Sequence, residues 1–315
     1  MSKIQDALQR FQSGKSQTPS PEPVVRAPAA TPPRKRVESG ASQVLNALVE
    51  VKLRDLRDAG LMTSVSNEKV LSNQYRDIKR PLIASALGKR ATKVDDGNLI
   101  MVTSAISGEG KSFTSTNLAM SIAREQDLSV VLVDADVAKP HLSSVFGLGD
   151  RPGLLDLLEG NIDKLGQVIY PTSIEGLSVL PAGAPRPHAA ELLSGSRMES
   201  TLRHLADIDP DRIVVFDTPP LLQSSESKAL LSVAGQVVFV VKAGSTTQGT
   251  VANALQELDD QKAVNLVLNQ VPSGHGVYSG GYGYGYGYSY KSDDDSVEAT
   301  SETAVEPSNG SIFNS

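Results

Sequence analysis

The sequence predicts an α/β protein with a doubly wound, mostly parallel sheet and polar tails at both ends. Apolar runs of strand length alternate along the chain with segments of helical periodicity, which is the order typical of parallel sheets. The apolar runs are continuous rather than alternating, which indicates strands that are covered on both faces. With 315 residues, 39% of them hydrophobic, the chain can bury one sizeable core.

Composition divides the chain into four segments. Residues 1–41 begin with a short amphipathic stretch and continue as a basic, Pro- and Ser-rich linker, for which we predict disorder. Residues 42–95 carry apolar residues at three- and four-residue spacing, which predicts helices that lead into the core domain at 96–272. Residues 273–315 are rich in Gly, Tyr and acids, and they too are predicted to be disordered. The positions that predict the lead-in helices are Leu45, Leu48, Val49, Leu53, Leu56, Val70, Leu71, Tyr75, Ile78 and Leu82.

Six apolar runs predict the strands of the core domain. They are NLIMVTS (98–104), SVVLVDAD (129–136), LSVLPA (177–182), RIVVFDTP (212–219), QVVFVVKA (236–243) and VNLVLNQ (264–270). Helical segments between them include 113–125 and 188–206. In open parallel sheets, ligands bind beyond the carboxyl ends of the strands, so polar residues at those ends are the candidates for a site.

Composition also excludes several classes of protein. The chain has no cysteine, so disulfides and thiolate zinc sites are ruled out. No window approaches the 18 to 20 apolar residues of a membrane span, and the N-terminus does not resemble a signal peptide. A net charge of −6 without a dominant basic face argues against nucleic acid as a partner. We therefore expect a cytoplasmic protein.

A phosphate-binding loop follows the first strand of the core domain. Residues 105–112 read AISGEGKS and differ from GxxxxGK[ST] only at Ala105. Glycines let backbone amides surround phosphate oxygens, Lys111 reaches the terminal phosphates, and the Ser112 hydroxyl is a ligand for Mg²⁺. The sequence thus predicts ATP and Mg²⁺ as cofactors. The candidate nucleotide-binding residues here are Ala105, Ser107, Gly108, Glu109, Gly110, Lys111, Ser112 and Phe113.

Three aspartates end two other strands, Asp134 and Asp136 on one and Asp217 on the other. Asp217 resembles a Walker B residue, which holds Mg²⁺ through water, and Asp134 or Asp136 could orient or deprotonate an attacking hydroxyl. A single aspartate after a strand is often only a helix cap or turn residue. Three of them beside a phosphate-binding loop favour a catalytic site, with Ser112, Asp136 and Asp217 as candidate metal ligands.

Together these motifs resemble the bacterial P-loop tyrosine kinases, and more narrowly the tyrosine autokinases of exosortase-associated exopolysaccharide loci. The resemblance covers about residues 70–290 and rests on five stretches in order: SAISGEGKSFTSTNLA, VVLVDADVAKPHLSSVFGL, LPAGAPRPHAAELLSG, IVVFDTPP and VLNQV. It implies that Lys111 neutralises developing charge, that Asp134 accepts or orients the tyrosine proton, and that Asp136 joins the Mg²⁺ network. It also suggests an adenine contact for Asn269, although Asn at a strand end is often a turn residue.

The resemblance gives a role to the tyrosines, six of which lie in the tail out of eight in the chain. In this family a C-terminal tyrosine cluster is phosphorylated, with the tail of one subunit entering the active site of its neighbour. The alternative is a low-complexity tail for self-association or a solvated end. The candidate autophosphorylation sites are Tyr278, Tyr282, Tyr284, Tyr286, Tyr288 and Tyr290.

The resemblance further implies an assembly at the inner membrane. We expect a homo-oligomer, in the family a ring, whose candidate contacts are Arg76, Lys79 and Arg80. The expected partners are a membrane-spanning polysaccharide chain-length regulator, which activates the kinase, and a tyrosine phosphatase. The protein would then be cytoplasmic and peripheral to the inner membrane, regulating exopolysaccharide polymerisation and export.

Two departures from the family keep other functions open. The arginine of its Asp-x-Asp-x-Arg motif is Ala138 here, which leaves Lys139 as the nearby cation and is compatible with a catalytically weak nucleotide-binding scaffold. In the family's oligomerisation motif, Glu-x-x-Arg-x-x-Arg, only Arg76 matches strictly, and Lys79 stands in for the second arginine. The other rival is an ATPase switch of the partition or cell-division type, but those carry an extra lysine early in the loop, where this chain has Ile106.

Overall fold

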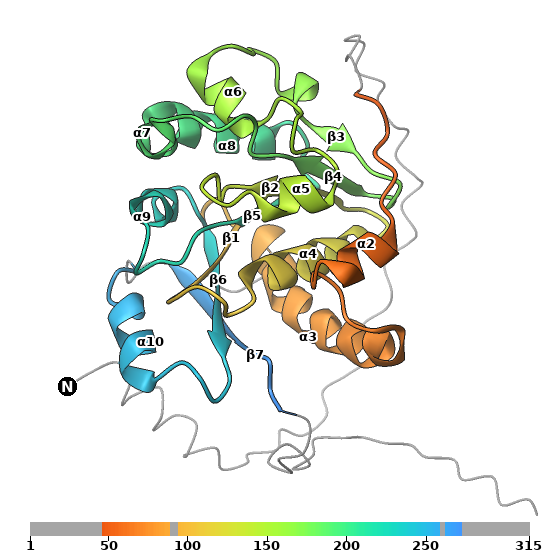
Figure 1. Ribbon diagram of the computed structural model, residues 1–315, viewed down its shortest axis with the longest axis vertical. Helices are drawn as coiled ribbons and strands as arrows, with labels where there is room; N and C mark the ends of the chain where they lie inside the picture. The colour runs from red at the N-terminus through yellow and green to blue at the C-terminus, as the bar shows by residue number, and fades with distance from the viewer. Residues whose placement is uncertain (1–45, 89–93, 259–261, 273–315) are drawn as a thin grey trace, which may run out of the picture. The chain divides into compact units, whose positions relative to one another are not determined.

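The computed structural model describes residues 46–88, 94–258 and 262–272, which form a sheet with helices on both faces (Figure 1). The predictions made for residues 1–41 and for the tail at 273–315 lie outside these residues. The four-segment division of the chain therefore stays a prediction.

Seven strands form the sheet in the described part of the chain, in the order β3-β4-β2-β5-β1-β6-β7. Every pairing is parallel except that of β3 with β4. All six predicted strands are present, and the predicted doubly wound, mostly parallel sheet is confirmed. The two-residue strand β3 was not predicted because it is too short to give a periodic signal. The strands are β1 (Leu99–Ser104), β2 (Ser129–Asp134), β3 (Tyr170–Pro171), β4 (Leu177–Leu180), β5 (Arg212–Asp217), β6 (Gln236–Lys242) and β7 (Ala263–Asn269).

Helices cover the two faces of the sheet and enclose a separate apolar core on each side (Figure 1). The first four helices pack over one face, where β1 contributes Ile100 and Val102. They are α2 (Leu53–Asp58), α3 (Glu68–Ala86), α4 (Lys111–Ala123) and α5 (His141–Val145). The later helices pack over the other face, where β1 contributes Leu99 and Met101. They are α6 (Leu154–Glu159), α7 (Ala189–Ser194), α8 (Ser196–Asp207), α9 (Ser225–Leu231) and α10 (Gln248–Leu255).

Burial along the strands follows their place in the sheet. All six residues of the central strand β1 are buried, as its continuous apolar run predicts. The edge strand β7 instead alternates between partly buried and exposed residues. None of the helices in the described residues is long and apolar enough to cross a membrane.

The structure corrects the prediction that residues 42–95 begin with a helix. From Asn46 to Lys52 the chain is extended, and the Val49 amide donates to Pro171 O at 2.8 Å while Val49 O accepts from the Ser173 amide. Val49 and Val51 pack on the core at the two-residue spacing of extended backbone. Helix therefore begins only at Leu53, and the short turn η1 (Val65–Asn67) precedes α3.

The predicted helix at 188–206 is two helices. It breaks at Gly195, whose backbone is extended (φ −80°, ψ 156°) and which precedes the first residue of α8. The glycine inside this segment was the available sign of the break.

Candidate nucleotide-binding and catalytic site

The phosphate-binding loop joins β1 to α4 and has the backbone that phosphate binding needs. Gly108 and Gly110 lie at φ 82° and 93°, in the left-handed region that favours glycine, and α4 begins directly after Gly110. Ser107 and Gly108 are exposed, whereas Ala105 is buried at the end of the strand. The exposed turn at the N-terminus of α4 thus presents backbone amides to a phosphate.

Glu109 braces the loop from inside the protein. Its side chain is 1% exposed, and one carboxylate oxygen accepts the Ile106 amide at 2.7 Å. The other oxygen accepts the Lys242 amide at the end of β6 and the Thr246 hydroxyl in the turn that follows. We predicted Glu109 as a nucleotide-binding residue, and the structure gives its carboxylate a supporting role for the loop.

Asn269, at the end of β7, also contacts the loop. Its Nδ2 donates to Glu109 O at 2.9 Å, and an added Cβ on Gly110 would lie 2.0 Å from that nitrogen. Gly110 is therefore required both for its backbone angle and for this close approach. The adenine contact suggested for Asn269 stays a prediction.

Lys111, the first residue of α4, lies among the site's carboxylates and is 7% exposed. Burial lowers the pKa of its amine, and this is opposed first by Asp217 and then by Asp136. Buried ammonium groups are stable only beside opposite charge, and these carboxylates supply it.

Asp217 ends β5 and accepts the Ser112 hydroxyl at 2.6 Å on Oδ2. Its side chain is 1% exposed, and Oδ1 has no hydrogen-bond partner. Burial, and after it the charge of Asp134, raises the pKa of Asp217 to about 7, against the lowering effect of the Ser112 hydrogen bond. Two candidate metal ligands, Ser112 and Asp217, are thus already in contact.

Asp134 lies opposite Asp217 in the register of β2 and β5. Its Oδ2 accepts both the amide and the hydroxyl of Ser143, at 2.8 and 2.7 Å, while its buried Oδ1 has no partner. Burial raises the pKa of Asp134 to about 6, against the lowering effect of Ser143. Ser143 was not predicted as a site residue, although its amide lies in the first turn of α5, where amides lack partners within the helix.

Asp136 is half-buried at the mouth of the same strand. Burial raises its pKa, while hydrogen bonding from the Lys139 amide, at 3.2 Å, and the charges of Lys111 and Lys139 lower it. Lys139 also lies near enough to Lys111 to lower the pKa of that amine. A cation therefore remains beside the site although Ala138 replaces the family arginine.

The structure brings together most of the predicted site. Lys111, Ser112 and the three aspartates converge at the carboxyl ends of β1, β2 and β5, as expected for a parallel sheet. Phe113 differs, because its side chain packs partly buried against the apolar core, which leaves its backbone as the part that could meet a nucleotide. The tail tyrosines lie outside the described residues.

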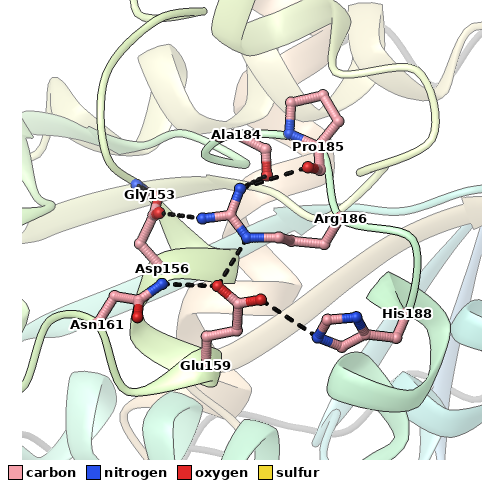
Figure 2. A network of polar contacts seen from close by, with 8 residues as sticks. All are labelled: Gly153, Asp156, Glu159, Asn161, Ala184, Pro185, Arg186 and His188. Atoms are coloured by element: carbon pink, nitrogen blue, oxygen red, sulfur yellow. Dashed lines mark hydrogen bonds and ion pairs between the residues drawn. The ribbon is translucent and has the colours of Figure 1, made fainter.

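A second polar cluster surrounds Arg186 (Figure 2). The guanidinium pairs with Asp156 at 2.9 Å and with Glu159 at 2.7 Å, both on α6. Asp156 also accepts the Gly153 amide, and Glu159 contacts His188. Hydrogen bonding from Arg186 is the largest cause of the lowered pKa of Glu159. Arg186 thus ties the segment before α7 to α6.

The candidate oligomerisation residues on α3 separate into two kinds. Arg76 and Arg80 are exposed. Lys79 is 6% exposed, and its amine contacts Ser121 O and Glu125 Oε1 (2.7 Å) of the same chain. This corrects the expectation of a subunit contact at Lys79, because its charge is used to pack α3 on α4.

The chain is similar to known P-loop NTPases and tyrosine-protein kinases. The family model for ParA, described as NUBPL iron-transfer P-loop NTPase, matches residues 96–259. Tyrosine-protein kinase YwqD of Bacillus subtilis is 35% identical over 187 residues, which cover 59% of this chain and 75% of YwqD. The putative tyrosine-protein kinase EpsB of Ralstonia solanacearum is 36% identical over 164 residues, which cover 51% of this chain but only 21% of EpsB.

A solved structure extends the comparison to three dimensions. The kinase domain of VpsO superposes with a TM-score of 0.55 at 29% identity, over 66% of this chain and 100% of that domain. A matching fold, a phosphate-binding loop and converging aspartates therefore accompany the sequence likeness. The chain belongs to the bacterial tyrosine-protein kinases, ATP-dependent transferases built on a ParA-type P-loop NTPase domain.

Proposed function

We propose that this protein transfers the γ-phosphoryl group of MgATP to tyrosine hydroxyls of its own C-terminal tail, between subunits. The observation that carries the proposal is a pair of buried aspartates, Asp134 and Asp217, which lie opposite one another and each keep one oxygen without a partner, with Lys111 beside Asp217. A buried carboxylate oxygen without a partner is costly in a folded protein, and a bound cation offsets that cost.

The residues fit a magnesium site of the kind that phosphoryl-transfer enzymes use. Mg²⁺ is commonly held by one or two carboxylates, a hydroxyl, water and the substrate phosphates. Ser112 and Asp217 supply the hydroxyl and a carboxylate, and Asp136 supplies a second carboxylate at the mouth of the site. When bound, the ion supplies charge neutralisation at the β- and γ-phosphate oxygens.

The remaining residues position the transfer. Amides of 107–111 would cradle the phosphates, and Lys111 would neutralise the charge that develops on them. A bond forms between the tyrosine oxygen and the γ-phosphorus, the bond from that phosphorus to the bridging oxygen of ADP breaks, and the hydroxyl proton passes to Asp134. Its pKa of about 6 leaves Asp134 ionised above neutral pH and able to accept the proton.

The tail is the substrate that best suits this chain. The two tyrosines outside the tail, Tyr75 and Tyr170, are each 5% exposed, which makes them poor acceptors. The tail places tyrosines at 278, 282, 284, 286, 288 and 290 in a setting of glycine and serine. Several phosphates there would repel one another and the acids that follow, which would couple phosphorylation to assembly.

The direct test is to incubate the purified chain with MgATP and to map phosphate by mass spectrometry, with Lys111→Met as the matched inactive variant. We expect phosphotyrosine within 278–290 in the parent and none in Lys111→Met. If the protein binds or hydrolyses nucleotide but forms no phosphotyrosine, even with an activating partner segment added, the kinase proposal fails and a switch or a scaffold takes its place.

Two observations weigh against those rivals. The position of the partition-type lysine is Ile106, whose side chain packs on the core and whose amide is held by Glu109. The loss of the arginine at Ala138 is the one feature that favours a weak scaffold, and Lys139 supplies a cation nearby.

We further propose that the kinase acts with a separate membrane-spanning chain-length regulator, on the cytoplasmic side of the inner membrane, in an exopolysaccharide system of the exosortase-associated type. The support is that the tyrosine kinases similar to this chain differ in length. The chain covers three quarters of YwqD but only a fifth of EpsB, so a kinase region of this kind occurs both in short proteins and in much longer ones. A homo-oligomeric ring through Arg76 and Arg80 and a resetting tyrosine phosphatase complete the proposal. Stimulation of tail phosphorylation by the cytoplasmic segment of the regulator would support it, and an unchanged rate would count against it.

A further inference from the structure

The edge strand β7 leaves an apolar stripe uncovered. Val264, Leu266 and Leu268 are 37%, 61% and 51% exposed, and they occupy alternate positions on one face of the strand. Val267, on the opposite face, packs against the core that α3 and α4 cover. Three aliphatic side chains in a row on an edge strand form a surface that proteins usually cover or charge.

The free backbone groups of β7 belong to the same residues. β7 pairs with β6 only, among the described residues, and Asn269 O accepts the Ala243 amide at 2.8 Å. Because backbone groups alternate in direction along a strand, those of residues 263, 265, 267 and 269 point to β6. The amides and carbonyls of 264, 266 and 268 point outward, where a further strand can pair with them.

The tail that follows β7 has the matching pattern. Tyr282, Tyr284, Tyr286, Tyr288 and Tyr290 recur at every second residue, and the residues between them are Gly or Ser. In an extended strand this spacing puts all five phenol rings on one face and leaves the other face nearly bare. Tyrosine also pairs favourably with aliphatic side chains across neighbouring strands.

The connection is long enough for the tail to return. Residues 270–281 separate the end of β7 from Tyr282, and twelve residues can span up to about 40 Å. β7 itself has seven residues, or about 23 Å of strand. An antiparallel return beside the strand that has just ended is the shortest such path.

We propose that residues 282–290 pair antiparallel with β7 as an additional strand, with their tyrosine rings over Val264, Leu266 and Leu268. The occupant is thus the chain's own tail, held by backbone hydrogen bonds and by an apolar face. Phosphorylation would release it, because each phosphate adds about −1.5 to −2 charge where the ring meets aliphatic side chains. The docking does not depend on the proposed kinase activity, whereas the release does.

The docking can be measured by amide hydrogen exchange on the full-length chain without nucleotide, in the Lys111→Met background so that the tail stays unphosphorylated. The comparison is with the same chain in which the five tyrosines at 282–290 are serine. We expect the amides of 264, 266 and 268 to exchange at least tenfold faster in the serine chain. The amides of 265 and 267, which face β6, are the internal control and should change little.

A second pair of variants tests the surface itself. Leu266→Thr with Leu268→Thr should speed exchange in the tail, whereas Val65→Thr, at an equally exposed valine on η1, should not. Equal exchange of the outward amides with and without the tyrosines would overturn the proposal. Protection that rises with protein concentration and is unchanged by the serine substitutions would also overturn it, because a second copy of the chain would then be the occupant.

Release is tested separately by adding MgATP to the wild-type chain. Loss of protection in step with phosphotyrosine formation supports release, and protection that persists on a fully phosphorylated tail contradicts it. Protection with no phosphate incorporated leaves the docking standing and contradicts the proposed function instead.

Discussion

Two groups of acidic side chains in this molecule differ in what surrounds them. Asp134 and Asp217 are buried beside one another, each keeps one oxygen without a partner, and burial raises both pKa values. Asp156 and Glu159 on α6 are instead held by Arg186, and pairing lowers the pKa of Glu159 (Figure 2). The first arrangement destabilises the folded state when the acids are ionised, and the second stabilises the folded state.

This difference in pairing separates acids that stabilise the fold from acids that belong to a functional site. Acids that stabilise the fold pair with a cation of the same chain, as Asp156 and Glu159 on α6 pair with Arg186. Acids that await a charged ligand stay incompletely satisfied, as at the mouth of β2 and β5. Lys111 and Lys139 do not balance the three aspartates when all three are ionised, so a divalent cation would complete the charge of the site.

The largest effect should come from Asp217→Asn. Replacing this carboxylate removes a charge from the proposed metal site and should lower phosphoryl transfer at least about 100-fold, while the protein stays folded. Initial rates of tail phosphorylation, with circular dichroism as the folding control, measure this. A rate within threefold of wild type would show that Asp217 is not part of the metal site.

Ser143→Ala should destabilise the protein by about 1–3 kcal/mol, because Asp134 loses a hydrogen-bond donor and the Ala182 amide loses its acceptor. Urea unfolding at pH 8 measures the free energy. Ser144→Ala, at an exposed neighbour on α5, is the matched control and should have almost no effect. Equal stability of both variants would mean that the Ser143 contact does not matter.

Arg186→Met should affect the fold rather than the chemistry. It leaves Asp156 and Glu159 without their cation, so we expect a melting temperature lower by a few degrees and a transfer rate within about threefold of wild type. Arg197→Met, at a more exposed arginine 3.7 Å from Asp163, serves as the control and should shift the melting temperature less. A large loss of transfer in a stable Arg186→Met protein would place this cluster in the active site.

The smallest effect is on the pH dependence of stability. Since the pKa of Asp217 is raised to about 7 in the folded state, the folded state binds a proton that the unfolded state releases, and stability falls as pH rises from about 4 to 7. Asp217→Asn should therefore raise the melting temperature, relative to wild type, by a few degrees more at pH 8 than at pH 5, without metal or nucleotide.

Glu159→Gln should show the opposite sign. Its lowered pKa in the folded state gives stability that is present above the ordinary range of a glutamate and is lost as pH falls. The variant should thus lose stability relative to wild type near neutral pH and less so at pH 3. If Asp217→Asn and Glu159→Gln changed stability in the same direction near neutral pH, the contrast between the two groups of acids would be contradicted.

Much of the fold and the first shell of the site could be predicted from the sequence. The strands were visible because strands buried on both faces give continuous apolar runs, and β1 is buried at every residue. The loop and the three aspartates were visible because their spacing and position at strand ends are local properties of the chain.

The contacts across the chain could not be predicted in this way. Ser143 reaches Asp134 only once α5 is packed beside β2, and Asn269 reaches the loop across 160 positions of sequence. Lys79 was expected at a subunit contact because it stands at an arginine position of the family's oligomerisation motif, yet it is buried against α4 and contacts a residue 42 positions away. The helix expected before Leu53 is extended because residue 49 pairs with β3, a contact that local periodicity does not contain.

The most direct test of the central claim is the affinity for ADP with and without Mg²⁺, measured by calorimetry on wild-type protein and on Asp217→Asn. The account predicts that wild type binds MgADP at least tenfold more tightly than ADP in a metal chelator, and that Asp217→Asn removes most of this difference. Equal affinity for the two forms in the wild-type protein would contradict it, because the carboxylates of Asp134 and Asp217 would then not serve a metal–nucleotide complex.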